Sequence, residues 1–127
     1  MKQEDEKMNF CWCTIQVKDM KESLKFYEEI VGLEIDSSMK GEEGFEINFL
    51  GKGQTKVELI YDKTNTTSPI GQDISLGFQV ESLEKKMAFM KEKNIPIDSG
   101  PFKPNPNTSF FYVKDPNGLK IQFVEMS

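Results

Sequence analysis

TIQVKDMKESLKFY (residues 14–27) and GFQVESLEKKMAFM (residues 77–90) decide the fold, because the second stretch repeats the pattern of the first. Val17 aligns with Val80, and Phe26 aligns with Phe89. Further along, KVELIYD (residues 56–62) aligns in the same way with KIQFVEM (residues 120–126). Self-similarity of this kind indicates two copies of one structural unit.

Each copy predicts a strand, a helix and three further strands, which makes the fold class α+β with two βαβββ repeats. We place the first repeat at about residues 9–62 and the second at about 73–127, within one domain spanning residues 1–127. The segment between them, KTNTTSPIGQ (residues 63–72), has the Thr, Asn, Ser, Pro and Gly content of an exposed linker.

Both helices carry recognisable start signals. Asp19 with Glu22 three residues later predicts the first N-terminus, and Gly32 predicts its end. Ser82 predicts the start of the second helix, and Asn94, which lies ahead of Pro96, predicts its end. At helical spacing, the apolar residues expected to face the core are Met20, Leu24, Tyr27 and Val31 in the first helix, and Leu83, Met87 and Met90 in the second.

The remaining strands are expected at about residues 33–39, 44–50 and 55–61, and at 96–99, 109–115 and 119–125. Three prolines in GPFKPNPN (residues 100–107) predict an extended, stiff loop, and DPNG (residues 115–118) predicts a tight turn.

Strand parity separates a core face from a polar face, since alternate side chains point to opposite sides of a sheet. The expected core face holds Cys13, Ile15, Val17, Val57, Leu59, Tyr61, Leu76, Phe78, Val80, Leu119, Ile121 and Phe123. The other face holds Trp12, Thr14, Gln16, Lys56, Glu58, Ile60, Ser75, Gly77, Gln79, Lys120, Gln122 and Val124. That face could be plainly solvated, but an indole among carboxamides and a carboxylate is typical of a pocket. Twisted sheets would curl such faces around a common cleft.

Composition excludes several function classes. The chain has 127 residues and a net charge of −5, and its charged stretches are mixed in sign, which disfavours nucleic acid as a partner. Its apolar runs are far shorter than a membrane-spanning helix needs, and the polar residues 1–8 do not resemble a secretory signal, so we expect a cytoplasmic protein. Cys11 and Cys13 are expected to be reduced, buried core thiols rather than a metal or redox pair.

TIQVKDMKESLKFYEEIVGLEI (residues 14–35) and YVKDPNGLKIQFVE (residues 112–125) resemble motifs of the vicinal-oxygen-chelate superfamily of glyoxalases, bleomycin-resistance proteins and dioxygenases. The resemblance spans roughly residues 10–125. It implies curved mixed sheets around a cleft, a small-molecule ligand and a homodimer.

In metal-bearing members, the resemblance implies four ligand positions, which fall at Trp12, Glu58, Ser75 and Gln122. Only Glu58 is a good ligand, and the chain contains no His. Gln122 stands where the lyase branch would place a catalytic Glu, and an amide cannot act as a base near neutral pH. Glu125 has the opposite parity and should point away. We therefore expect no cofactor, with a loosely held divalent metal as the alternative.

Two hypotheses remain open. The first is a metal-independent binding protein of the bleomycin-resistance type, in which Trp12 stacks on an aromatic or cationic ligand and Gln16, Gln79 and Gln122 orient it, with Thr14, Glu58 and Ser75 in the same ligand-binding set. The second is an enzyme similar to lactoylglutathione lyase, acting on a thiol hemithioacetal with Glu58 as the catalytic residue. A structural role for Glu58 is a cross-strand pair with Lys56 or Lys120.

Overall fold

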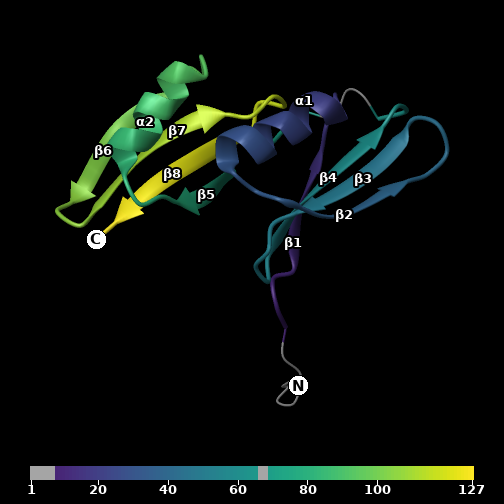
Figure 1. Cartoon of the computed structure of the whole chain (residues 1–127), viewed down its shortest axis with the longest axis horizontal. Helices are drawn as coiled ribbons and strands as arrows, with labels where there is room; N and C mark the ends of the chain where they lie inside the picture. Colours follow the sequence, from purple (N-terminus) through teal and green to yellow (C-terminus); the bar gives the residue numbers. More distant parts are fainter. Residues whose placement is uncertain (1–7, 66–68) are drawn as a thin grey trace. The chain divides into compact units, whose positions relative to one another are not determined.

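The computed structural model describes residues 8–65 and 69–127, and it forms two compact units (Figure 1). Parts of the predicted polar N-terminus and of the predicted linker lie outside the described residues. The first unit holds strands β1 to β4, and the second holds β5 to β8 together with Glu29–Val31. No helix in the described part of the chain is long and apolar enough to span a membrane.

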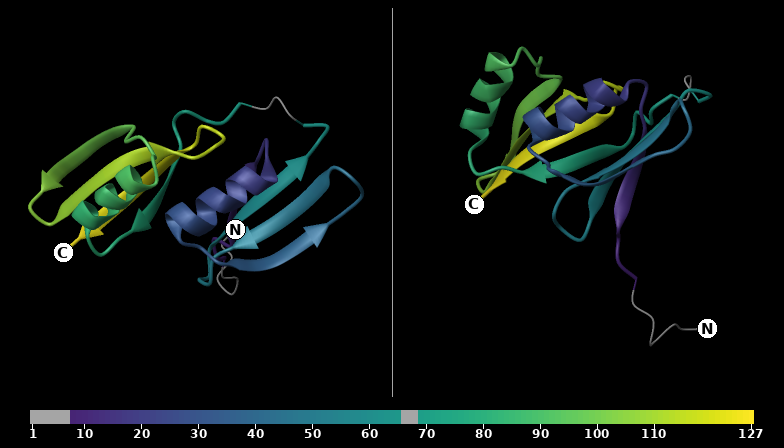
Figure 2. Two further views of the ribbon diagram at one scale, coloured as in Figure 1. Left: turned by 45° about the horizontal axis from the view of Figure 1, so that its top comes forward. Right: turned by 45° about the vertical axis from the view of Figure 1, so that its right-hand side comes forward.

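The first unit is one mixed sheet with a helix packed over β4 (Figure 2). Its elements are β1 (Trp12–Gln16), α1 (Met20–Lys25) continued by the π-helix η1 (Phe26–Val31), β2 (Ile35–Lys40), β3 (Phe45–Leu50) and β4 (Lys56–Asp62), although the last three residues of η1 group with the second unit. The strand order is β1-β4-β3-β2, with β1 parallel to β4 and the other pairs antiparallel.

The second unit repeats this plan with α2 packed over β8 (Figure 2). Its elements are β5 (Ser75–Gln79), α2 (Leu83–Glu92), β6 (Ser99–Asn105), β7 (Thr108–Lys114) and β8 (Lys120–Met126). The strand order is β5-β8-β7-β6, again with only the first pair parallel. The predicted α+β class and the βαβββ arrangement of each unit are therefore confirmed.

Both predicted helix starts are confirmed by their capping contacts. The Asp19 carboxylate accepts a hydrogen bond from the Glu22 amide (3.0 Å), and the Ser82 hydroxyl accepts one from the Lys85 amide (3.2 Å). Each bond satisfies an amide that has no partner within the helix. Gly32 closes the first helix with φ +90°, a left-handed conformation that glycine adopts without strain.

The predicted stripe of the first helix was wrong at two of its four positions. Met20 and Tyr27 are buried, but Leu24 and Val31 are only partly buried, and Phe26 is buried instead. For Val31 the cause is the π-helical turn that starts at Phe26, because this turn holds more residues than an α-turn and rotates the side chains that follow it, whereas Leu24 lies before the turn. The 3.6-residue spacing counted from Met20 then no longer identifies the inward face.

The predicted loop at residues 100–107 was also wrong, since most of it is strand β6. β6 lies at the outer edge of its sheet and pairs with β7 through Phe102 and Phe110. Prolines lack an amide hydrogen, but an edge strand has one side on which no partner needs it. Irregular register between Ser99 and Asn105 accommodates the remaining disruption.

The helix-packed face of each sheet forms its core. Leu50 and Leu59 are fully buried in the first unit, as are Phe111, Ile121 and Phe123 in the second. Phe111 and Phe123 pack with ring centroids 5.5 Å apart. The parity prediction for this face therefore holds in its central strands, which leaves the opposite face of each sheet free to carry polar side chains.

Candidate functional site

The face of the first sheet opposite its helix brings a carboxylate beside two aromatic rings. Backbone pairing sets Glu58 between Thr14 on one side and Phe49 on the other. The Thr14 hydroxyl donates a hydrogen bond to Glu58 Oε1, and only 9% of Glu58 is exposed. Trp12 packs edge-on against Phe49 with ring centroids 5.1 Å apart, while 47% of Trp12 stays exposed. The arrangement presents a mostly desolvated anion next to an accessible indole.

Of the two cross-strand pairs considered for Glu58, the one with Lys56 does not occur, and the other candidate, Lys120, belongs to the second unit. The Lys56 ammonium instead donates to the Gly53 carbonyl (2.9 Å) and lies 3.9 Å from the Asp36 carboxylate. Among the described side chains, Thr14 is the hydrogen-bond partner of Glu58. Among the residues that the structure describes in this unit, its negative charge therefore has no paired cation.

The corresponding face of the second sheet is organised around Gln122. Its side-chain amide donates to the Tyr112 hydroxyl (3.2 Å), and Tyr112 lies directly across from it on β7. On the other side stands Gly77, where a Cβ would meet Gln122 Oε1 at 3.0 Å. The missing side chain gives Gln122 the room to lie flat against β5. Ser75 and Gln79 are exposed on the same face.

The predicted site residues thus fall into two groups. Trp12, Thr14, Gln16 and Glu58 share one face of the first sheet, and Ser75, Gln79 and Gln122 share one face of the second. Glu125 points to the helix side, as its parity predicted, where its carboxylate accepts a hydrogen bond from the Leu83 amide (2.7 Å). That contact fixes the start of α2, and it keeps Glu125 on the helix side of its sheet, away from the two faces that carry the predicted site residues.

Sequence reasoning missed the aromatic residues of the middle strands. Phe49 on β3, and Phe110 and Tyr112 on β7, lie on the same faces as the predicted residues. Alternation along a strand assigns faces only within that strand. Extending it across β3 and β7 needs the strand register, which the residue pattern alone does not supply.

The donor set does not fit the metal that the resemblance implies. Glu58 is the one strong oxygen ligand of the four positions, and its carboxylate already accepts from Thr14. The indole of Trp12 offers no lone pair, and Ser75 and Gln122 are neutral, weak donors. Within residues 8–65 and 69–127, no three His, Cys, Asp or Glu side chains gather into a group that could hold an ion. The residues present therefore do not match a catalytic divalent site.

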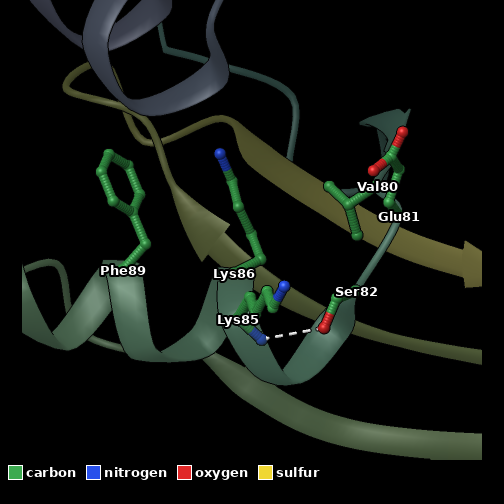
Figure 3. Close-up of a pocket in the computed structure, with 6 residues that line it drawn as sticks. All are labelled: Val80, Glu81, Ser82, Lys85, Lys86 and Phe89. Atoms are coloured by element: carbon green, nitrogen blue, oxygen red, sulfur yellow. Dashed lines mark hydrogen bonds between the residues drawn. The ribbon is translucent and has the colours of Figure 1, made fainter.

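A separate hollow of about 550 Å³ lies at the start of α2, lined by Val80, Glu81, Ser82, Lys85, Lys86 and Phe89 (Figure 3). The Lys86 ammonium points into it, 4.9 Å from the Phe89 ring centroid and 4.8 Å from that of Phe123. Burial lowers the pKa of Lys86, because a desolvated ammonium is less favourable than a neutral amine. None of the predicted ligand-binding residues lines this hollow.

The prediction that both cysteines lie buried in the core was wrong. Cys11 and Cys13 are both free thiols, but Cys11 is exposed and Cys13 is only partly buried. Cys11 precedes the first residue of β1 and so lies beyond the sheet that would cover it. Partial burial raises the pKa of the Cys13 thiol.

The family model described as "Glyoxalase/Bleomycin resistance protein/Dioxygenase superfamily" matches residues 9–123. The chain belongs to this superfamily, and the resemblance drawn from its two motifs is confirmed.

Among curated relatives, the chain is 28% identical over 120 residues to a lactoylglutathione lyase of Haemophilus influenzae, covering 87% of each chain. It is 26% identical over 121 residues to a probable lactoylglutathione lyase of Synechocystis, covering 89% of this chain and 92% of the relative.

Solved structures point to the same fold with different functions. The trypanothione-dependent glyoxalase I of Leishmania major matches with a TM-score of 0.80 and 25% identity, covering 94% of this chain and 87% of the other. The antibiotic-binding protein TnmS3 of Streptomyces matches with a TM-score of 0.74 and 22% identity, covering 94% and 97%. Proteins of this fold thus include both an enzyme and a binding protein, so the two functions have to be distinguished by the chemistry of the site.

Proposed function

We propose that this chain is a metal-independent small-molecule-binding protein, and that its ligand places a cationic or hydrogen-bond-donating group against Glu58. The observation that carries the proposal is the Glu58 carboxylate itself, which is 9% exposed and held by the Thr14 hydroxyl, with no paired cation among the described residues of its unit. A desolvated carboxylate gains more from a ligand cation than an exposed one, because water screens the attraction less.

The exposed indole of Trp12 favours a ligand that contains an aromatic ring. Its edge-on contact with Phe49 fixes the indole, and nearly half of its surface remains open to a planar group. A fixed aromatic ring loses little conformational freedom when a ligand stacks on it. Gln16 lies on the same face, further along β1, and can donate or accept at the edge of a ligand.

The test uses Trp12 as its own reporter, since it is the single tryptophan of the chain. Metal-free bleomycin, which joins planar rings to a positively charged tail, should quench or shift Trp12 emission at saturable concentrations. Glu58→Gln keeps the side-chain shape and removes the charge, so it should weaken binding about tenfold, which corresponds to roughly 1.4 kcal/mol. Glu34→Gln, at an exposed carboxylate paired with Lys52, is the matched control and should bind like the parent.

Equal bleomycin affinity in the parent, Glu58→Gln and Glu34→Gln would contradict the assignment of Glu58 to a cation. Calorimetry should accompany the fluorescence, because it also measures Trp12→Phe, which loses the reporter. That variant should bind more weakly if the indole stacks on the ligand, and unchanged binding would remove Trp12 from the site.

A lactoylglutathione-lyase-like enzyme is the second candidate, and the curated relatives favour it. In that case Glu58 would serve as the acid–base group for the hemithioacetal of methylglyoxal and glutathione. The assay is turnover of that hemithioacetal with and without added Zn²⁺, Ni²⁺ or Co²⁺, on protein freed of any affinity tag. Stoichiometric metal together with turnover that Glu58→Gln abolishes would overturn the binding-only proposal.

We further infer a cytoplasmic homodimer, in keeping with the superfamily. Light scattering coupled to size-exclusion chromatography tests the assembly, and a mass of one chain at micromolar concentration would refute it. Fractionation of the native host would test the location.

A further inference from the structure

Lys86 holds its amine in a partly desolvated setting on the helix side of the second sheet. Its Nζ donates a hydrogen bond to the Ile30 carbonyl (2.5 Å), and Ile30 belongs to the same compact unit. The ring centroids of Phe89 and Phe123 lie 4.9 Å and 4.8 Å from Nζ. One carbonyl and two ring faces thus hold the amine in place, and none of them neutralises its charge.

Among the described residues, no carboxylate lies within ion-pair distance of the Lys86 amine. Burial lowers the pKa of Lys86, whereas a hydrogen bond to the Glu34 carboxylate raises the pKa of the exposed Lys52. A lysine is a nucleophile only when it has lost its proton. Lys86 is therefore better placed than a solvated or ion-paired lysine to attack an electrophilic carbon.

The hollow beside Lys86 has room for a ligand. Its volume of about 550 Å³ lies within the usual range of small-molecule pockets. Lys86 and Phe89, three residues apart, extend from the same side of α2, and Val80 adds a second apolar group to the lining (Figure 3). Glu81 and Lys85 contribute opposite charges to the same lining, so a neutral ligand is favoured over an ion of either sign.

We propose that Lys86 is a covalent capture site for neutral aromatic aldehydes, with the ring of the aldehyde packed against Phe89 and its carbonyl carbon bonded to the Lys86 nitrogen. A planar ring gains from contact with the Phe89 ring, and this contact holds the carbonyl carbon near the amine. The site lies on the helix side of the second sheet, so it does not rest on the roles proposed for Glu58 and Trp12.

The covalent step is an imine condensation. After Lys86 has lost a proton to water, its nitrogen lone pair adds to the carbonyl carbon and the carbon–oxygen double bond opens. The oxygen then leaves as water, with one hydrogen from the nitrogen and the proton that was lost at the start. The product is an iminium ion with one N–H and the same positive charge as the ammonium. That N–H can still donate to the Ile30 carbonyl, and the rings of Phe89 and Phe123 attract the iminium as they attract the ammonium.

The experiment measures where an aromatic aldehyde attaches to the full chain. The protein is incubated with 2-naphthaldehyde and sodium cyanoborohydride, which reduces each imine to a stable secondary amine, and tandem mass spectrometry quantifies the adduct at every lysine. We expect more adduct at Lys86 than at its neighbour Lys85 or at Lys52. With propanal, which has no ring, the ratio of Lys86 to Lys85 adducts should fall about 2- to 10-fold.

These ratios compare lysines of one protein, so differences in reactivity between the two aldehydes cancel. Labelling at Lys86 that does not exceed labelling at Lys85 would overturn the proposal, and this comparison needs no variant. An unchanged ratio with propanal would overturn the assignment of an aromatic ligand. Unfolding the chain in urea should abolish the preference for Lys86, whereas a preference that persists in urea would show that the fold does not create it.

Variants then locate the site, with circular dichroism to show that each is folded. Lys86→Arg keeps a cation that can donate to the Ile30 carbonyl but forms no imine, so the preferred adduct should be lost. Phe89→Leu keeps apolar bulk and should lower the ratio of Lys86 to Lys85 adducts about 2- to 10-fold. Lys85→Arg, at the adjacent residue of the same hollow, is the matched control and should leave the Lys86 adduct unchanged.

An undiminished total of adduct in Lys86→Arg would refute the site. Failure of Glu58→Gln to alter bleomycin binding would leave this result untouched, because the two tests use different probes and residues of different units.

Discussion

Replacing Glu125 with Ala should destabilise the second unit more than removing any other carboxylate near the start of α2. The Glu125 carboxylate accepts the Leu83 amide at 2.7 Å in a partly buried setting, and this bond joins β8 to the helix. A hydrogen bond to a charged group contributes about 1.5–3 kcal/mol, and a carboxylate at a helix N-terminus adds up to about 1 kcal/mol. We expect Glu125→Ala to lower the free energy of unfolding by about 2 kcal/mol.

Two control variants separate the effect of this hydrogen bond on stability from the effect of a nearby negative charge and from the effect of an ordinary helix cap. Glu84→Ala removes a carboxylate from the same first turn and should cost about 0.3–1 kcal/mol. Ser82→Ala removes the bond to the Lys85 amide and should cost about 1 kcal/mol. Urea unfolding followed by circular dichroism gives the three values, and amide hydrogen exchange reports Leu83 directly. The reasoning fails if Glu125→Ala costs no more than Glu84→Ala, or if exchange at Leu83 stays slow.

Three further outcomes follow from burial and from the pKa shifts. Iodoacetamide at pH 8 should alkylate Cys13 more slowly than the exposed Cys11, because partial burial restricts access and the raised pKa of Cys13 lowers its thiolate fraction. Equal alkylation rates of the two cysteines by mass spectrometry would contradict this expectation. Hydrogen bonds from the Thr64 hydroxyl and amide hold the pKa of Asp62 below its ordinary value. This contact therefore stabilises the fold at neutral pH, and its contribution disappears as the pH falls through the lowered pKa. Thr64→Val should raise the pKa of Asp62 in an NMR titration, and an unchanged midpoint would argue against the role of the hydroxyl. Met90→Ala empties a fully buried position and should cost about 2–5 kcal/mol in urea unfolding, whereas a loss under about 1 kcal/mol would mean that the core closes over the gap.

The candidate site was predictable in part, because strand parity depends only on local chain geometry. Parity placed Glu58 with Thr14 and Trp12, and Gln122 with Gln79, before any register was known. It could not place the residues of the middle strands, because their alignment with β4 and β8 depends on hairpin geometry. It also could not say that Thr14 rather than Lys56 would contact Glu58, since both are close in the sheet and side-chain packing chooses between them.

The sequence by itself determined the repeat, the class of fold and the helix starts, because these depend on short-range rules. A capping side chain reaches an amide three residues away, and alternation along a strand is a property of the extended backbone. The loss of His is equally visible in the sequence, and it excludes the imidazole ligands that many metal enzymes use.

Tertiary structure alone decided that Phe26 is buried and Val31 only partly buried, and where β6 runs. The π-turn at Phe26 changes the inward face of the helix, and the edge position of β6 makes its prolines tolerable. Both outcomes depend on the packing of segments distant in the chain, where burial and hydrogen bonding to a neighbour outweigh local preference. The contact between the Phe102 and Phe110 rings has the same origin, since these rings meet only after β6 and β7 have paired.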